Sequence, residues 1–171
     1  MTVLRGDWLA ARQTRAVMAM LTVAGHQAYF VGGCVRDALL ERPVADLDIA
    51  TDAHPARVLA LARKSGLRGI ATGFDHGTVT VISGDTAHQI TTFRKDIKTD
   101  GRHAVVSFAD NIDDDARRRD FTMNALYANC EGEVFDPLGG MSDLRAGRVR
   151  FIGDAGSRII EDHLRSLRFF R

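Results

Sequence analysis

Four clusters of charged residues in this 171-residue chain have types and spacings that suit chemistry on phosphates. The first is Asp46-Leu47-Asp48, within a stretch typical of a strand. Because successive strand side chains point to opposite faces, the two carboxylates would share one face. Carboxylates bind Mg2+, and two such ions about 4 Å apart stabilise the attacking and leaving oxygens of a phosphoryl transfer. The pair predicts a metal site, and the simpler alternative is a solvated edge strand.

The second cluster is the stretch Gly32-Gly33-Cys34-Val35-Arg36-Asp37, where a strand enters a glycine turn and a helix leaves it. Glycine lets the backbone approach a phosphate, and the N–H groups at a helix N-terminus attract anions. Arg36 in the first helical turn opposes the helix dipole unless an anion is present. The cluster indicates a phosphate-binding turn, or else a tight turn with Arg36 and Asp37 as surface charges.

The third cluster is Arg117-Arg118-Arg119, followed by Asp120 and Asn124. Consecutive arginines hold a triphosphate or a nucleic-acid backbone through bidentate hydrogen bonds. A predicted helix over 117–126 would place Asp120 and Asn124 on one face, within reach of a ribose hydroxyl. The simpler interpretation is a solvated, basic helix start.

The fourth cluster lies at the C-terminus, where Asp162, Arg165, Arg168 and Arg171 recur at every third position of a predicted helix. A carboxylate only accepts hydrogen bonds and a guanidinium only donates them. Side by side, they complement the amino donor and ring-nitrogen acceptor of cytosine and adenine, whereas guanine and uracil present the reverse pattern. The pair predicts selection of C and A without a nucleic-acid template, or else an ordinary ion pair worth a few tenths of a kcal/mol.

Apolar periodicity divides the chain into mixed helices and strands, without repeats or low-complexity tracts. A Ser-Gly-Asp turn between two alternating stretches indicates a hairpin. This mixture predicts an α/β or α+β domain built on a mixed sheet. In chain order we expect a helix over 4–24, a strand over 28–31, a helix after the glycine turn that ends near residue 40, a strand over 46–50, a helix over 55–65, strands over 78–82 and 88–93, a polar loop over 94–104, a strand over 105–108, a helix over 117–126, a turn at 136–140, a strand over 148–152 and a helix from 157 to the end.

Composition limits the possible partners and compartments. Lys plus Arg number 23 and Asp plus Glu 22, so the net charge of +1 argues against gripping nucleic acid by bulk charge, although a local basic face remains open. Two cysteines without a CxxC or Cys/His cluster predict neither a disulfide scaffold nor zinc, and favour a reducing cytoplasm. The uncharged run over 16–35 contains a helix end and two glycine turns, so we expect no membrane-spanning helix and no secretory signal.

Together, four motifs resemble the class II tRNA nucleotidyltransferase and bacterial poly(A) polymerase family, in the family's order from about residue 28 onward. They are YFVGGCVRDALLERPVADLDIATDAHP over 29–55, RRDFTMNAL over 118–126, the hinge-like DPLGGMSDL over 136–144 and the base-templating EDHLRSLRFFR over 161–171. The resemblance implies a five-stranded mixed sheet with flanking helices, followed by helical neck, body and tail domains. We expect a catalytic head over 1–141 and the start of a truncated neck over 142–171, with the body and tail absent.

The resemblance also implies a role for each matching residue. One position departs from the family: Gln89 stands where an acidic residue is frequent, which would weaken a metal site. By resemblance, Asp46 and Asp48 would be catalytic and hold two Mg2+ ions, Gly33, Arg36 and Arg119 would contact the nucleotide phosphates, Asp120 and Asn124 would lie near the ribose, Asp162 and Arg165 would pair with the incoming base, and Arg168 and Arg171 would support the nucleotide.

The stretch TGFDHGTV over 72–79 resembles a segment of CCA-adding members, and the loop over 94–104 resembles the one they use in moving from C to A addition. The implied activity is transfer from CTP and ATP to the tRNA 3′ end. For His76, hydrogen bonding to the turn is favoured over a role as catalytic base. The alternatives are poly(A) addition to RNA and a nucleotide-binding fragment without turnover. No membrane partner is expected, and the oligomeric state is not predicted.

Overall fold

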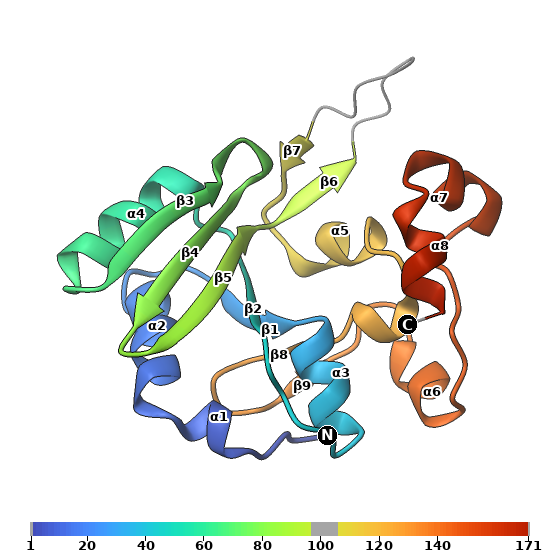
Figure 1. The fold of residues 1–171 in the computed structure, drawn as a ribbon, viewed down its shortest axis with the longest axis horizontal. Coiled ribbons are helices and arrows are strands. Elements are labelled where there is room, and N and C mark those ends of the chain that lie inside the picture. The colour runs from blue at the N-terminus through green and yellow to red at the C-terminus, as the bar shows by residue number, and fades with distance from the viewer. Residues whose placement is uncertain (1, 97–105, 171) are drawn as a thin grey trace.

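The computed structural model describes residues 2–96 and 106–170 and has a seven-stranded mixed sheet at its centre (Figure 1). The strand order is β3-β4-β5-β2-β1-β8-β9; β2 and β5 run parallel and the other neighbours antiparallel. The predicted α/β class on a mixed sheet is confirmed, although with seven strands rather than five. The strands are β1 Ala28–Val31, β2 Leu47–Thr51, β3 Arg68–Gly73, β4 Thr78–Ser83, β5 Thr86–Thr92, β8 Tyr127–Ala128 and β9 Val134–Phe135, with β6 Arg94–Asp96 and β7 Val106–Phe108 forming a separate ribbon.

Short helices surround the sheet, and α7 and α8 lie on the opposite side of the molecule from α4 and β3 (Figure 1). Within the described ranges, no helix has the length and apolar character needed to cross a membrane. The helices are α1 Asp7–Ala10, α2 Arg12–Thr22, α3 Gly33–Leu39, α4 Pro55–Lys64, α5 Ile112–Arg117, α6 Gly140–Arg145, α7 Ala155–Glu161 and α8 Leu164–Phe169, with 3-10 turns η1 Phe74–His76 and η2 Thr122–Asn124.

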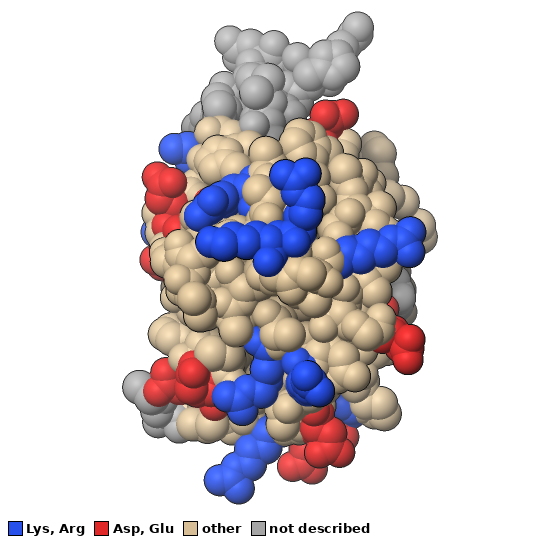
Figure 2. Space-filling model, turned by 90° about the vertical axis from the view of Figure 1, so that its left-hand side faces the viewer, with Lys and Arg blue, Asp and Glu red and all other residues tan. Residues whose placement is uncertain are grey.

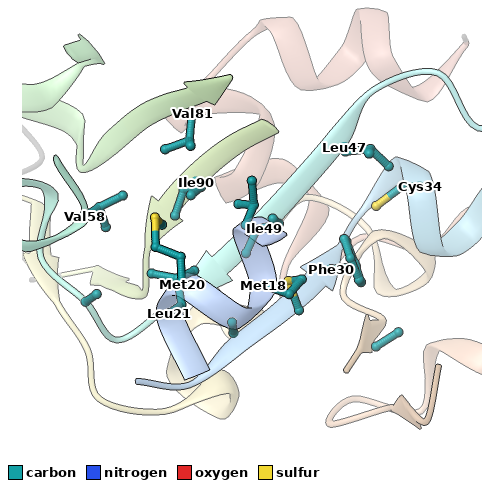
Figure 3. Packing of buried hydrophobic residues seen from close by; sticks show 14 of the residues in the cluster. Met18, Met20, Leu21, Phe30, Cys34, Leu47, Ile49, Val58, Val81 and Ile90 are labelled. Atoms are coloured by element: carbon teal, nitrogen blue, oxygen red, sulfur yellow. The ribbon is translucent and has the colours of Figure 1, made fainter. Parts of the chain in front are cut away.

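The two faces of the sheet bury two separate apolar clusters. Phe30 and Ile49 face α2 and α4, where they pack with Leu21 and other fully buried side chains (Figure 3). Their neighbours Val31 and Ala50 point to the other face, into a smaller cluster beside α5. Each fully buried aliphatic or aromatic side chain stabilises the fold by about 1.5–3 kcal/mol. The larger cluster therefore contributes most of the apolar burial, and the smaller one packs the face of the sheet beside α5.

The predicted helix over 4–24 is wrong, because two helices meet at Ala11. Ala11 has an extended backbone (φ −57°, ψ 132°) that separates α1 from α2. Leu4 N donates to Gly132 O at 2.7 Å, so the chain before α1 is extended and pairs with a distant segment. Trp8 packs edge-on against Phe30, with 4.9 Å between the ring centroids. These long-range contacts outweigh the local helical pattern.

Two further helix boundaries differ from those expected. The helix near the arginine cluster is α5, which ends at Arg117 instead of starting there; Asn111 caps it by accepting from Asp114 N at 2.9 Å. The predicted last helix is broken at Asp162 (φ −153°, ψ 102°), which lies between α7 and α8. The expected strand over 148–152 is a single bridge between Phe121 and Phe151.

The remaining expectations agree more closely with the structure. The predicted strand over 28–31, the helix over 55–65 and the hairpin of β4 and β5 are present, with boundaries within a few residues of those expected. β3 was not predicted. β6 forms at the start of the predicted polar loop, and β7 lies within the strand expected over 105–108. Residues 97–105 lie outside the described part of the chain.

Gly140 is expected to tolerate no side chain. It begins α6, and a Cβ at this position would overlap the carbonyl group of Thr122. Relieving backbone overlap in a packed region typically costs about 1–3 kcal/mol. We expect Gly140→Ala to lower the free energy of unfolding by at least that amount in urea denaturation. Gly156→Ala is the matched control, since its Cβ would meet only the side-chain end of Asp154. If Gly140→Ala were as stable as wild type, the close contact between Gly140 and the Thr122 carbonyl would be contradicted.

One outer face of the molecule is basic despite the near-neutral chain. α4 and the start of β3 carry exposed basic side chains and no acidic residue. Figure 2 looks onto this side and shows Lys and Arg side chains gathered on it. The local basic face that composition left open is therefore present, far from α7 and α8. Its members are Arg57, Arg63, Lys64 and Arg68.

Candidate active site

The two acidic residues of the first cluster lie at the start of the central strand β2. Asp48 is half-buried on the sheet face that Ala50 shares, and Asp46 is exposed just before the strand. Among the residues that the structure describes, neither carboxylate accepts a hydrogen bond or forms a close ion pair. Burial raises the pKa of Asp48 above its usual value; the charge of Arg119 opposes this shift, and the charge of Asp46 adds to it.

This pair has the donor chemistry that a hard cation requires. Two carboxylates without a side-chain partner among the described residues provide oxygen ligands, and a bound cation would favour the ionised form of Asp48, which burial and the charge of Asp46 disfavour. Gln89 is the neighbour of Asp48 in the parallel pairing of β2 with β5, and it offers a neutral amide instead of a third charge. In the described ranges, no group of three or more His, Cys, Asp or Glu side chains is placed so that it could hold a metal ion. The pair fits Mg2+ that completes its coordination with water or substrate oxygens.

The glycine turn after β1 lies beside the arginine cluster. Gly32 is buried at φ +76°, a conformation that favours glycine. A Cβ there would lie 3.9 Å from Arg119 Nη1, and a Cβ at Gly33 would lie 3.8 Å from Arg36 Nη2. Both guanidinium groups therefore approach the turn. Gly33 begins α3, and Gly32, which was not among the predicted site residues, is the glycine that the backbone requires.

Arg119 is held by two buried groups that sequence analysis missed. Its Nη2 donates to Asp115 Oδ2 at 2.8 Å, and its Nε donates to the same oxygen at 3.1 Å and to Tyr127 Oη at 3.0 Å. Burial would raise the pKa of Asp115, yet the charges of Arg119 and Arg118 hold it below its usual value. Burial also raises the pKa of the Tyr127 hydroxyl. The one signal in the sequence is the four-residue spacing from Asp115 to Arg119.

A continuous set of hydrogen bonds connects the glycine-turn helix to the C-terminal helices. Arg36 Nη1 donates to Asn124 Oδ1 at 2.8 Å, and Asn124 Nδ2 donates to Asp120 Oδ1 at 3.1 Å. Arg168 then bridges Asp120 and Asp162, with 2.9 Å from its Nε and Nη2 to the two carboxylates. Asp120 and Asn124 do meet, through the turn η2 rather than along the predicted helix. Residues from three predicted clusters therefore belong to one network.

A pocket of about 240 Å³ lies at the end of this network. Asp162 and Arg165 both line it, but their side chains do not pair with each other: Arg165 Nη1 donates to Glu161 Oε2 at 2.6 Å. The hydrogen bond from Arg168 holds the pKa of Asp162 below its usual value. The predicted stripe along one helix is thus wrong, because the chain bends at Asp162, and Arg171 lies outside the described residues. The lining residues are Arg118, Arg119, Asp120, Asp162, Arg165 and Arg168.

Two other predicted features lie at the margin of the site. Asp136 forms the expected turn: its carboxylate accepts from Gly140 N at 2.7 Å and from Met141 N at 3.0 Å, which fixes the start of α6. His76 ends η1, and its carbonyl accepts from Arg94 Nη1 at 2.9 Å. Its ring makes no hydrogen bond within the described part of the chain.

The mixed sheet, the two carboxylates at the start of its central strand and the arginine-rich pocket define a nucleotidyltransferase-type head domain. The family model described as "Poly A polymerase head domain" matches residues 28–150, and the chain belongs to that family.

Individual relatives agree with this placement. The chain is 47% identical over 161 residues to a CCA-adding enzyme of Lactobacillus delbrueckii subsp. bulgaricus and 43% identical over 162 residues to one of Anoxybacillus flavithermus. The alignments cover 93% and 94% of this chain, which spans 40% of the length of each relative.

Solved structures show the same fold. The Bacillus stearothermophilus CCA-adding enzyme in complex with CTP matches with a TM-score of 0.84 at 37% identity, over 97% of this chain and 38% of that one. A tRNA nucleotidyltransferase complexed with a primer tRNA and an incoming ATP analog matches with a TM-score of 0.69 at 31% identity, over 90% and 43% of the two chains.

Proposed function

We propose that this chain is the catalytic head of a cytoplasmic enzyme that adds C and A to the 3′ end of tRNA from CTP and ATP. The observation that carries the proposal is the pocket between Asp162 and Arg165, which the network through Asp120 joins to the arginines beside the glycine turn. The names of the similar proteins support CCA addition. We assign residues 1–141 to the head and 142–171 to the start of a neck, and the free thiols of Cys34 and Cys130 suit a reducing compartment.

In this proposal, Asp46 and Asp48 hold Mg2+, which supplies positive charge for the triphosphate and lowers the pKa of the tRNA 3′-hydroxyl. Arg119 and Arg36 hold phosphate oxygens beside Gly33, and the fixed Arg119 guanidinium needs little reorganisation because Asp115 already orients it. Asp120 and Asn124 lie between the phosphate arginines and the base-reading residues, where a ribose would lie. The chain thereby orients the reacting groups for an in-line transfer.

Base selection would depend on Asp162 and Arg165, two of the residues that line the pocket. The Asp162 carboxylate would accept a hydrogen bond from the amino group of cytosine or adenine, and the Arg165 guanidinium would donate one to the ring nitrogen beside it. Arg168 holds the Asp162 carboxylate from the other side, so the acceptor is kept ionised and in place. Arg171 is assigned to nucleotide support from sequence alone.

Replacing Asp162 with Asn is expected to relax the preference for CTP over UTP by roughly 10- to 100-fold, because an amide both accepts and donates. The measurement is kcat/KM for each nucleotide with a tRNA lacking its 3′ end. Asp154→Asn is the matched control: Asp154 only caps α7, accepting from Ser157 N at 2.8 Å, and Asn retains that acceptor. Unchanged rejection of UTP in Asp162→Asn would contradict the assignment.

The proposed function itself is tested by incubating the full natural chain that contains these residues with the same tRNA, Mg2+ and one or both nucleotides. Incorporation of both CMP and AMP, abolished by EDTA, is the expected result. Incorporation of AMP alone into general RNA would favour a poly(A) polymerase. Nucleotide binding without incorporation at high tRNA concentration would favour a binding module without turnover, for which Gln89 beside Asp48 is the structural reason.

A further inference from the structure

Arg158 is a buried arginine on α7 that does not line the pocket, and its side chain is directed at backbone carbonyls. Its side chain is 9% exposed. Nη2 donates to Arg117 O at 2.7 Å and to Arg119 O at 3.0 Å, and Nε donates to Ile152 O at 3.0 Å. Nη1 donates to Glu161 Oε2 at 2.9 Å. One guanidinium thus joins α7 to the arginine-bearing loop about forty positions earlier in the chain.

The main chain of Arg158 also reaches the other half of the pocket. Its carbonyl accepts from Arg165 Nη1 at 2.7 Å, in addition to the bond from that nitrogen to Glu161. The side chain of Arg158 therefore holds the backbone that carries Arg119, while its carbonyl holds the side chain of Arg165. A change in the position of Arg158 would move the two lining residues relative to each other.

Only an arginine can make this set of contacts. The planar guanidinium presents five N–H donors in a fixed fork, whereas the lysine ammonium donates from a single nitrogen. Arg158→Lys keeps the charge but cannot reach acceptors on both Ile152 and the 117–119 loop in the same geometry. This substitution therefore separates the effect of shape from the effect of charge.

The C-terminal segment has a second attachment that is independent of Arg158. Phe151 packs against Phe121 and Phe169, with 4.8 Å and 5.9 Å between the ring centroids, and Arg168 pairs with Asp120 at 2.9 Å. Loss of the hydrogen bonds from the Arg158 guanidinium should therefore shift the C-terminal segment without detaching it from the rest of the domain. A shift of about 1 Å in a site of this kind can cost about 100-fold in rate.

We propose that Arg158 is a positioning residue that fixes the distance between the phosphate-holding loop at Arg119 and the base-reading residue Arg165. The inference rests on the proposed function of this pocket. It assigns to α7 a part in nucleotide selection, although Arg158 itself contacts no substrate.

The test compares Arg158→Lys with wild type and with Arg145→Lys, an exposed position at the end of α6. We measure kcat/KM for CTP and UTP in the full natural chain, equilibrium binding of both nucleotides, and the thermal midpoint. Arg158→Lys should lower kcat/KM for CTP by roughly 10- to 100-fold and reduce the CTP-to-UTP preference at least fivefold. The folded state should persist at the assay temperature, and Arg145→Lys should match wild type.

A fall in thermal midpoint with an unchanged CTP-to-UTP preference would assign Arg158 a purely structural role and overturn the inference, as would an unchanged rate and preference. Wild-type protein that transfers no CMP would refute the proposed function instead. In that case the ratio of the CTP and UTP binding affinities still tests the inference. The inference is contradicted if wild type binds CTP in preference to UTP and Arg158→Lys keeps the same preference. It is also contradicted if wild type shows no preference.

Discussion

Asp48→Asn is expected to lower the rate of nucleotide transfer on the order of 1000-fold, the upper range for removing one preorganised electrostatic group. Asp48 lies on the central strand β2, half-buried, without a hydrogen-bond partner among the described residues and close enough to Arg119 and Asp46 for their charges to act on its pKa. An amide is a neutral ligand and holds a divalent cation far less strongly than a carboxylate. Transfer at saturating Mg2+ is the measurement.

Mg2+ dependence provides a second readout for the same residue. Because burial raises the pKa of Asp48, the carboxylate takes up a proton at a higher pH than an ordinary aspartate does. The Mg2+ concentration required for half-maximal rate should therefore rise as the pH falls through that raised pKa, before ordinary aspartates are protonated. In Asp48→Asn this pH dependence should be lost.

Asp52→Asn is the matched control at the opposite end of the same strand. Asp52 accepts from Gln27 N at 2.9 Å and from the ring of His26, and Asn retains an acceptor for the backbone contact. We expect this variant to transfer nucleotides at the wild-type rate. Wild-type activity in Asp48→Asn, with Mg2+ still required, would place the metal site elsewhere.

The second large effect is expected for Asp115→Asn, which should lower the free energy of unfolding by about 3–5 kcal/mol, the range for breaking a buried ion pair. The Asp115 side chain is 1% exposed and bonds Arg119, Tyr127 Oη at 2.8 Å and Arg94 N at 3.1 Å. Its loss leaves the Arg119 guanidinium without its counter-charge inside the protein. Urea denaturation at neutral pH measures the difference.

The pH dependence of stability has a definite sign for this residue. The folded-state pKa of Asp115 is held below its ordinary value of about 3.9, so the stability it contributes is present above that pH. It is lost as the pH falls through the lower, folded-state value. Asp113→Asn, exposed in the first turn of α5, should change stability by less than about 1 kcal/mol. Equal stabilities of the two variants would contradict the role of Asp115.

Local patterns were sufficient to predict the centre of the sheet. The apolar stretch at 28–31 bounded by Gly32-Gly33 coincides with β1, and the alternating stretches on either side of Gly84 form the hairpin of β4 and β5. The acidic strand differs by one residue, since β2 starts at Leu47. In these segments the period-two alternation and the turn residues agree with the burial that tertiary structure imposes.

The features that sequence analysis missed depend on distant contacts. Nothing near Ala11 predicts that the preceding residues pair with the segment around Gly132, which breaks the first helix. Asp115 directly follows two other acidic residues, so the local sequence does not mark it as buried, and only the folded chain brings Tyr127 to its carboxylate. The bend at Asp162 similarly replaces an expected ion pair with Arg165 by one with Arg168. Boundaries and partners of this kind are set by packing rather than by local propensity.

The order of the strands also has a consequence for the kinetics of folding. β4 and β5 are joined by two residues, so their hairpin closes a small loop, whereas β1 pairs with β8 by joining Phe30 to Ala128. Closing the longer loop costs more chain entropy before any contact compensates for it. Arg119 and Tyr127 lie within the segment that this closure brings to the sheet. During refolding, the backbone amides of the β4–β5 hairpin should therefore become protected from hydrogen exchange early. The site around Arg119 should form only in the slowest folding phase.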